Sequence, residues 1–269
     1  LYKSKVEYGG WTVNHIQGCS HGCLFPCYAF MMSKRFGRVK SYEDWLHPEI
    51  VENAESILKA ELAKLYTSID HIHLSFMTDP FMYDVESGGL NTEVKKTSLG
   101  IIRIINQYGI PVTVLTKGFY PEELLKNDYL KDNFFGITLV SLNEDFRRRI
   151  EPYTAPYEAR IESLRKLSEA GYNTWVSIEP YPTPNIDSSA SDIIPLLERI
   201  KFVKKLVFGK LNYNVTSGLF TDNDMFYENT AQTIIDFCDK HSIELCIKKS
   251  TPLCRNENIF SDLKAVSLI

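Results

Sequence analysis

The sequence predicts an α/β fold, a partial or open (β/α) barrel of the TIM type with about seven strand-helix units. Short apolar segments rich in β-branched residues alternate with amphipathic segments along the chain. This alternation is typical of a parallel sheet covered by helices. Polar residues also follow the strand segments at their carboxyl ends, where barrel enzymes place their chemistry. A doubly wound sheet is the alternative for the same alternation.

The first predicted strand covers residues 11–17 and runs into a cysteine-rich loop. A helical segment, 28–36, follows the loop. Pro48 opens a longer helix to about Leu65, in which apolar residues recur at spacings of three and four. The later segments alternate: strands are expected at 72–77, 112–115, 136–142, 174–178, 206–211 and 243–247, and helices at 92–108, 122–130, 157–170, 192–200 and 229–241.

Each of the seven predicted strands ends in a hydrogen-bonding or charged group. Because the carboxyl ends of parallel strands meet at one end of a barrel, we expect these groups to share one mouth. The alternative is that they are polar simply because loops are polar. The seven segments are the cysteine loop 18–28 and residues 77–80, 116–118, 141–143, 179–181, 210–213 and 248–250.

The cysteine loop holds Cys19, Cys23 and Cys27, half of the six cysteines of the chain. Clustered thiolates select iron–sulfur clusters or zinc. No second pair of Cys or His at zinc-finger spacing follows, and His21, which could complete a zinc site, lies inside the same loop. A cubane cluster held by three cysteines leaves one iron open for chemistry. The pattern favours the cluster, with zinc and buried structural cysteines as alternatives.

The loop resembles that of the radical S-adenosylmethionine (SAM) superfamily, with Phe25 before and Tyr28 after the last cysteine. The usual family spacing is Cys-x3-Cys-x2-Cys, and Pro26 makes it Cys-x3-Cys-x3-Cys here. Further motifs fall in the order seen in the spore photoproduct lyase-like (DNA repair photolyase-type) branch: Thr78-Asp79-Pro80, Thr116-Lys117, Ser141, Glu151-Pro152 with Arg160, and Ile178-Glu179-Pro180.

The resemblance implies a radical SAM fold and a lyase-like enzyme with a [4Fe-4S] cluster on Cys19, Cys23 and Cys27. Such an enzyme reductively cleaves SAM to a 5′-deoxyadenosyl radical that abstracts hydrogen from a substrate. It needs an electron donor such as flavodoxin or ferredoxin. The implied cofactor-binding residues are Thr78 and Asp79 for the SAM ammonium, Lys117 for its carboxylate, Ser141 for the ribose, Phe25 and Tyr28 beside the cluster or adenine, and Glu179.

Other interpretations of these residues stay open. Asp79 before Pro80 could cap a turn, Lys117 before Gly118 could be a solvated loop end, and Ser141 could bond to nearby backbone. Glu151 and Arg160 are expected to form a structural ion pair.

The late strands, about residues 174–255, form the predicted substrate side. Lysines beside aromatic residues in this region suit an anionic or nucleotide-like small molecule, although they could be surface charges. Tyr213 and Lys248 are the catalytic candidates there. Cys254 is the candidate hydrogen-atom donor, a role implied by the resemblance to the lyases. Cys238 and Cys246 are expected to pack in the core.

A chain of 269 residues with 44% apolar composition is sufficient for one core, so we expect a single domain over residues 1–269. The net charge of −4 does not favour duplex DNA, and the run 147–149 of three arginines is expected to be a solvated helix face. No apolar run is long enough to span a bilayer, so we expect a cytoplasmic protein. A zinc-stabilised barrel and a non-catalytic nucleotide- or partner-binding protein are the alternative functions.

Overall fold

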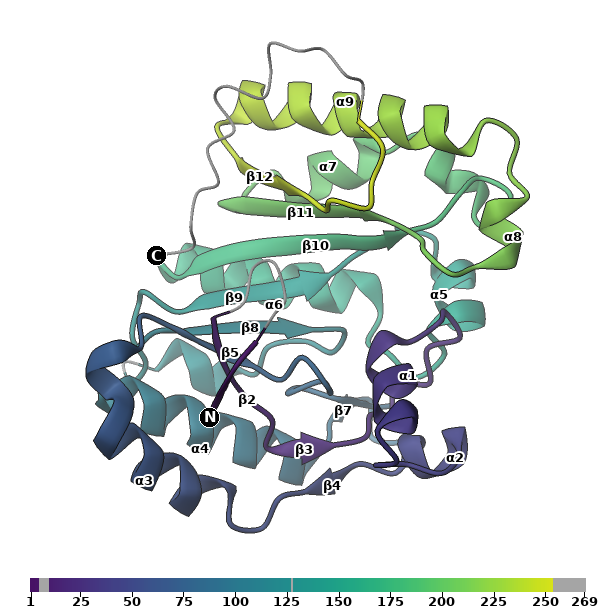
Figure 1. Ribbon diagram of the computed structural model, residues 1–269. Coiled ribbons are helices and arrows are strands. Elements are labelled where there is room, and N and C mark those ends of the chain that lie inside the picture. The colour runs from purple at the N-terminus through teal and green to yellow at the C-terminus, as the bar shows by residue number, and fades with distance from the viewer. Residues whose placement is uncertain (5–9, 127, 254–269) are drawn as a thin grey trace.

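The computed structural model describes residues 1–4, 10–126 and 128–253. These residues form one eight-stranded sheet with two short two-stranded antiparallel sheets beside it (Figure 1). Strand β1 pairs antiparallel with β2, and every other neighbouring pair in the sheet is parallel. In sheet order the strands are β1 (Tyr2–Lys3), β2 (Trp11–Val13), β5 (Ile72–Leu74), β8 (Val112–Thr116), β9 (Phe134–Thr138), β10 (Asn173–Tyr181), β11 (Lys205–Lys210) and β12 (Glu244–Ile247).

All seven predicted strands are therefore present, and they lie side by side in chain order. A doubly wound sheet reverses its strand order at a switch point, so the doubly wound alternative is wrong. In the described part of the chain β1 and β12 are the two edges of the sheet, which does not close. The prediction of an open, partial barrel is confirmed.

Helices connect the strands, and α4, α6 and α9 contact the sheet directly. Within the described ranges, no helix has both the length and the apolar character needed to cross a membrane. The helices are α1 (Tyr28–Arg35), α2 (Tyr42–Leu46), α3 (Ala54–Leu65), α4 (Thr92–Gln107), α5 (Glu144–Ile150), α6 (Tyr157–Glu169), α7 (Ile194–Ile200), α8 (Val215–Gly218) and α9 (Asn223–His241), with 3-10 turns at Tyr66–Ser68, Glu122–Leu125 and Ser188–Ser191.

The core lies between one face of the sheet and these helices. Alternate residues of each strand point to opposite faces. In β8, Val112 and Val114 belong to the main hydrophobic core, whereas Thr113 lies on the other face. The same alternation puts Trp175, Ser177 and Glu179 of β10 on that second face, which is the polar inner surface of the open barrel.

Several predicted boundaries were wrong. The strand expected at 11–17 ends at Val13, because Ile16–Gln17 (β3) turns away to pair with Glu49–Ile50 (β4). The same pairing delays the helix expected from Pro48, so α3 begins only at Ala54. The strand expected to reach residue 77 ends at Leu74, because Ser75 has a positive φ of 62°. The helix expected at 122–130 is a single 3-10 turn, Glu122–Leu125. The chain also forms the unpredicted hairpin of β6 (Tyr83–Asp84) and β7 (Gly89–Leu90).

Candidate active site

The cysteine loop crosses the carboxyl ends of the strands, where α1, α2, α5 and α8 gather at the right of Figure 1. Backbone hydrogen bonds fix it near its start and at its middle: the Cys19 amide donates to Trp45 O (2.8 Å) and the Leu24 amide to Ile150 O (2.8 Å). Gly22 has a φ of 62°, and a Cβ there would lie 2.5 Å from the Tyr153 ring. Only glycine therefore allows this path.

The three cysteines of the loop are each partly exposed and free of disulfides. Burial raises the pKa of the Cys19 thiol, with further contributions from Asp79 and Cys23, and burial raises that of Cys23 to about 12. Lys117 opposes this effect at Cys23, because its Nζ lies 3.6 Å from the Cys23 sulfur. Tyr42 donates a hydrogen bond to Cys23 O (3.0 Å), and burial together with the three cysteine charges raises its pKa to about 12.

Lys117 belongs to a buried triad with Glu151 and Arg160. Lys117 Nζ lies 2.6 Å from Glu151 Oε1, and Arg160 lies 3.1 Å from Glu151 Oε2. Burial alone would raise the pKa of Glu151, but the two cations outweigh it and lower the pKa to about 2. Burial likewise opposes the charge of Lys117, yet Cys23 and Glu151 hold its pKa above the usual range. The predicted Glu151–Arg160 ion pair is confirmed, and it also anchors Lys117 beside Cys23.

Asp79 joins the exits of β5 and β8. Its Oδ1 accepts from the Thr116 hydroxyl (2.6 Å) and the Phe81 amide (2.9 Å), and its Oδ2 accepts from the Lys117 amide (2.7 Å). His21 Nδ1 lies 3.4 Å from Oδ2. Three hydrogen bonds therefore occupy most of the roughly four acceptor positions of the carboxylate. The predicted bond to the SAM ammonium stays a prediction.

The contact of His21 with Asp79 was not predicted from the sequence. Its Nε2 accepts from the Tyr83 amide (2.9 Å), so Nδ1 carries the proton and faces Asp79. Burial lowers the pKa of His21 to about 4, so the ring is neutral at pH 7. With both nitrogens in use, His21 is not available as a fourth metal ligand. The signal in the sequence was its position within the loop, two residues from Cys19.

The other predicted cofactor residues lie around the loop. Phe25 is buried against Phe146, with ring centroids 5.9 Å apart, and Tyr28 is 58% exposed at the start of α1. The Thr78 hydroxyl donates to Gly18 O, which fixes the beginning of the loop. Ser141 is buried and donates to Asp187 Oδ2 (2.6 Å), a partner that the sequence did not indicate. Their roles toward SAM stay predictions.

On the late strands, the predicted lysines lie near carboxylates. Lys248 Nζ is 4.0 Å from Glu179 Oε2 across the end of β10, and Lys210 Nζ is 3.9 Å from Asp224. Tyr213 is 84% exposed, outside this pairing. Cys238 is buried in α9 as predicted, whereas Cys246 on β12 is only half-buried. Cys254 lies outside the described residues.

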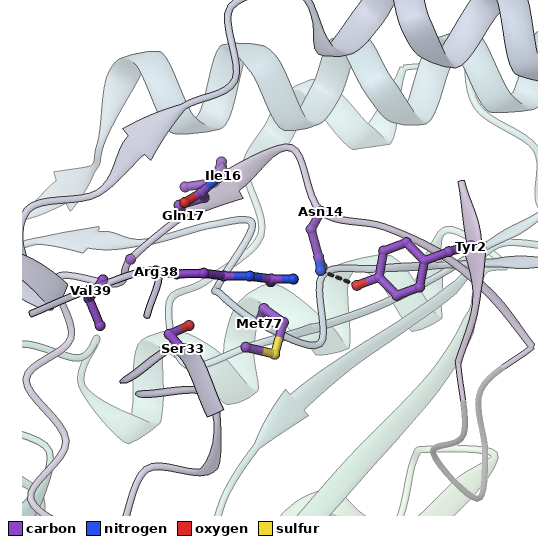
Figure 2. Close-up of a pocket in the computed structure, with 9 residues that line it drawn as sticks. Tyr2, Asn14, Ile16, Gln17, Ser33, Arg38, Val39 and Met77 are labelled. Carbon is purple, nitrogen blue, oxygen red and sulfur yellow. Dashed lines mark hydrogen bonds between the residues drawn. The ribbon is translucent and has the colours of Figure 1, made fainter. Parts of the chain in front are cut away.

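A cavity of about 320 Å³ lies between the start of the cysteine loop and α1 (Figure 2). The Asn14 side-chain amide donates to the Tyr2 hydroxyl at one end, and the Arg38 side chain extends toward Asn14. Gly18, the neighbour of Cys19, and Met77, the neighbour of Thr78, also line it. The cavity is therefore lined by the chain neighbours of Cys19 and of Thr78, which follows β5. Arg38 and Asn14 were not predicted, because nothing in their local sequence marks them.

The radical SAM superfamily profile matches residues 13–190, which include the cysteine loop and the exits of five of the parallel strands. The chain belongs to the radical SAM superfamily. Membership of this superfamily implies an enzyme with an iron–sulfur cluster and SAM as cofactors.

Two curated relatives match part of the chain. "Uncharacterized protein ORF301" of Acidianus two-tailed virus is 28% identical over 185 residues, covering 65% of this chain and 57% of the relative. "Uncharacterized protein MJ0683" of Methanocaldococcus jannaschii is 24% identical over 188 residues, covering 68% of this chain and 65% of the relative. The matches thus span about three fifths of the relatives' lengths.

Solved structures share the fold. A spore photoproduct lyase variant with bound AdoMet and dinucleoside spore photoproduct matches with a TM-score of 0.62 and 14% identity, over 91% of this chain and 78% of that chain. Streptococcus suis SuiB bound to S-adenosylmethionine matches with a TM-score of 0.54 and 9% identity, over 88% of this chain and 46% of that chain. These likenesses confirm the radical SAM fold, similar to that of the lyase.

Proposed function

We propose that this enzyme binds a [4Fe-4S] cluster through Cys19, Cys23 and Cys27 and reductively cleaves SAM. A reduced cluster held by these cysteines would supply the electron for cleaving SAM to methionine and a 5′-deoxyadenosyl radical, which would take a hydrogen atom from the substrate. The observation that carries the proposal is the placement of three free thiols, beside the Lys117 cation, at the mouth of an open barrel of this superfamily.

The donor set supports a cluster over a single zinc ion. Among the described residues, no three His, Cys, Asp or Glu side chains are grouped closely enough to hold one metal ion. A zinc ion needs its ligands within about 2.0–2.3 Å of one point, whereas the three cysteines of a cluster each bind a different iron. His21 cannot complete a zinc site, because both ring nitrogens already have partners.

The protein's own part is to hold the ligands and shield the site. Glu151 and Arg160 fix Lys117 beside Cys23, where its charge stabilises thiolate over thiol. Asp79 and His21 tie the loop to the exits of β5 and β8. Phe25 and Phe146 close the side toward α5. Iron binding would release the thiol protons that burial retains.

We assign the methionine end of SAM to the region of Thr78, Asp79 and Lys117, and the ribose to Ser141. The cavity lined by Gly18 and Met77 supports this placement, because these residues are the chain neighbours of Cys19 and Thr78. The lyase and SuiB structures were each solved with this cofactor bound.

For the substrate we propose a small anionic or nucleotide-like molecule on the inner face of the late strands. Glu179 and Lys248 offer an acceptor and a donor there, and an anionic substrate would compete with Glu179 for Lys248. The lyase neighbour holds a dinucleoside photoproduct, which supports a nucleotide-like class. Reduction requires a one-electron donor such as flavodoxin or ferredoxin.

The test is the formation of 5′-deoxyadenosine after anaerobic reconstitution, with dithionite and SAM. We expect the wild type to form it and Cys27→Ala to form none. A Lys248→Ala variant should still form 5′-deoxyadenosine but lose the added yield that a correct candidate substrate produces. Wild-type protein that forms no 5′-deoxyadenosine when fully loaded with iron and sulfide would contradict the proposal.

A further inference from the structure

We infer that residues 24–40, which include α1, form the docking surface for a small acidic protein that delivers single electrons to the cysteine site. This inference rests on the proposed function and identifies where its reductant binds. We call residues 24–40 the docking surface. Its exposed apolar residues, its charge and its closeness to the cysteines support this role.

The docking surface exposes large apolar side chains. Leu24 is 60% exposed, Tyr28 58% and Phe36 63%, and Met31 is also exposed. Tyr28, Met31 and Arg35 recur at spacings of three and four, so they share one face of α1. The opposite face carries the buried Ser33, which lines the cavity in Figure 2. A concentration of exposed apolar groups on a polar surface is typical of an interaction site.

Basic residues surround these apolar groups. Residues 28–42 include Lys34, Arg35, Arg38 and Lys40 and no acidic residue, in a chain whose net charge is −4. All four are exposed. Acidic side chains return only at Glu43 and Asp44 of α2, where Asp44 is held in the capping box of that helix. The surface is therefore complementary to an acidic partner, because opposite charges accelerate encounter and orient the two proteins.

The docking surface is connected directly to the cysteines. Cys27 is the N-cap residue of α1, and its carbonyl accepts from the Met31 amide (2.9 Å). Beneath the helix, Phe30 contacts Tyr42 with ring centroids 5.1 Å apart, and Tyr42 bonds to Cys23 O. A donor seated on α1 would thus contact the helix that begins directly after Cys27 and that packs on Tyr42, a hydrogen-bond partner of Cys23. In each transfer, the donor is oxidised by one electron and the cluster is reduced by one.

The test compares two reductants on the reconstituted enzyme. Lys34→Glu/Arg35→Glu is assayed for 5′-deoxyadenosine formation with reduced flavodoxin, an acidic flavoprotein, and with dithionite, which needs no docking surface. Lys59→Glu/Lys64→Glu on α3 makes the same change of charge at exposed positions away from α1 (Figure 1). We expect the α1 variant to lose about tenfold or more of the flavodoxin-driven rate at low salt.

The loss should shrink toward about 0.5 M salt, where screening removes the steering, and the dithionite-driven rate should stay within about twofold of wild type. The inference is wrong if the flavodoxin-driven rate is unchanged, if both reductants lose rate equally, or if the α3 variant shows the same loss. Wild-type enzyme that fails even with dithionite contradicts the proposed function instead. The dithionite assay also reports whether the α1 variant is folded.

Discussion

Replacing Glu151 with Gln should strongly destabilise the protein, because it leaves two cations without their anion. Glu151 and Arg160 are fully buried, and Lys117 keeps only 18% of its side chain exposed. Removing one partner of a buried ion pair costs about 3–5 kcal/mol. A domain has about 5–15 kcal/mol of stability in total. We therefore expect Glu151→Gln to lose about a fifth or more of the free energy of unfolding.

Urea unfolding followed by circular dichroism would measure this loss, with Glu158→Gln as the control. Glu158 pairs with Arg199 at 2.5 Å, but both side chains are largely exposed, so this change should cost less than about 1 kcal/mol. The pKa of Glu151 is lowered to about 2. The stabilisation is therefore present above about pH 4.5 and is lost as the pH falls toward 2. The difference between wild type and Glu151→Gln should be constant from pH 7 to 5 and narrow below that. Equal costs for the two variants at pH 7 would refute the triad as a stabilising element.

Two further predictions concern close backbone contacts. In Gly118→Ala, the new Cβ would lie 1.7 Å from the Phe81 carbonyl oxygen, so thermal unfolding should show a loss of about 3 kcal/mol or more in the free energy of unfolding. The control Gly218→Ala places its Cβ in open space and should stay within about 0.5 kcal/mol of wild type. An unchanged Tm for Gly118→Ala would contradict the packing of the two strand exits. In Gly136→Ala, the Cβ would lie 2.3 Å from the Trp175 ring across the β9–β10 pair. We therefore expect a loss of about 1–3 kcal/mol in the free energy of unfolding and a shifted tryptophan fluorescence emission. An emission spectrum identical to that of wild type would show that Trp175 does not lie beside Gly136.

The sequence predicted the sheet because hydrophobic periodicity is local. Every parallel strand alternates or runs apolar over a few residues, so the seven parallel strands β2, β5, β8, β9, β10, β11 and β12 could be found without tertiary information. The residues at which strands and helices begin or end could not be found in this way. β5 ends at Leu74 because Ser75 adopts a positive φ, and α3 begins late because Glu49–Ile50 pairs with Ile16–Gln17, more than thirty positions earlier. Both depend on contacts that no local pattern contains.

In the candidate site, too, local features could be predicted from the sequence and contacts between distant residues could not. Three cysteines within nine positions are visible in the sequence, and so is the order of the motifs that follow them. The sequence does not show that the Asp79 carboxylate accepts hydrogen bonds from Thr116, Phe81 and Lys117, because these bonds depend on how the exits of β5 and β8 meet. The engagement of Ser141 by Asp187 joins residues 46 positions apart. The sequence therefore predicted which residues gather at the mouth better than it predicted which of them are already paired.

The central claim is that Cys19, Cys23 and Cys27 hold a four-iron cluster. The most direct measurement is anaerobic reconstitution with iron and sulfide, followed by metal and sulfide analysis and by electron paramagnetic resonance of the dithionite-reduced protein. The account predicts brown protein with about four iron and four sulfide per chain, a spectrum of a reduced cluster that changes when SAM is added, and loss of both in Cys23→Ala. Colourless protein that instead retains one tightly bound zinc ion per chain would contradict it.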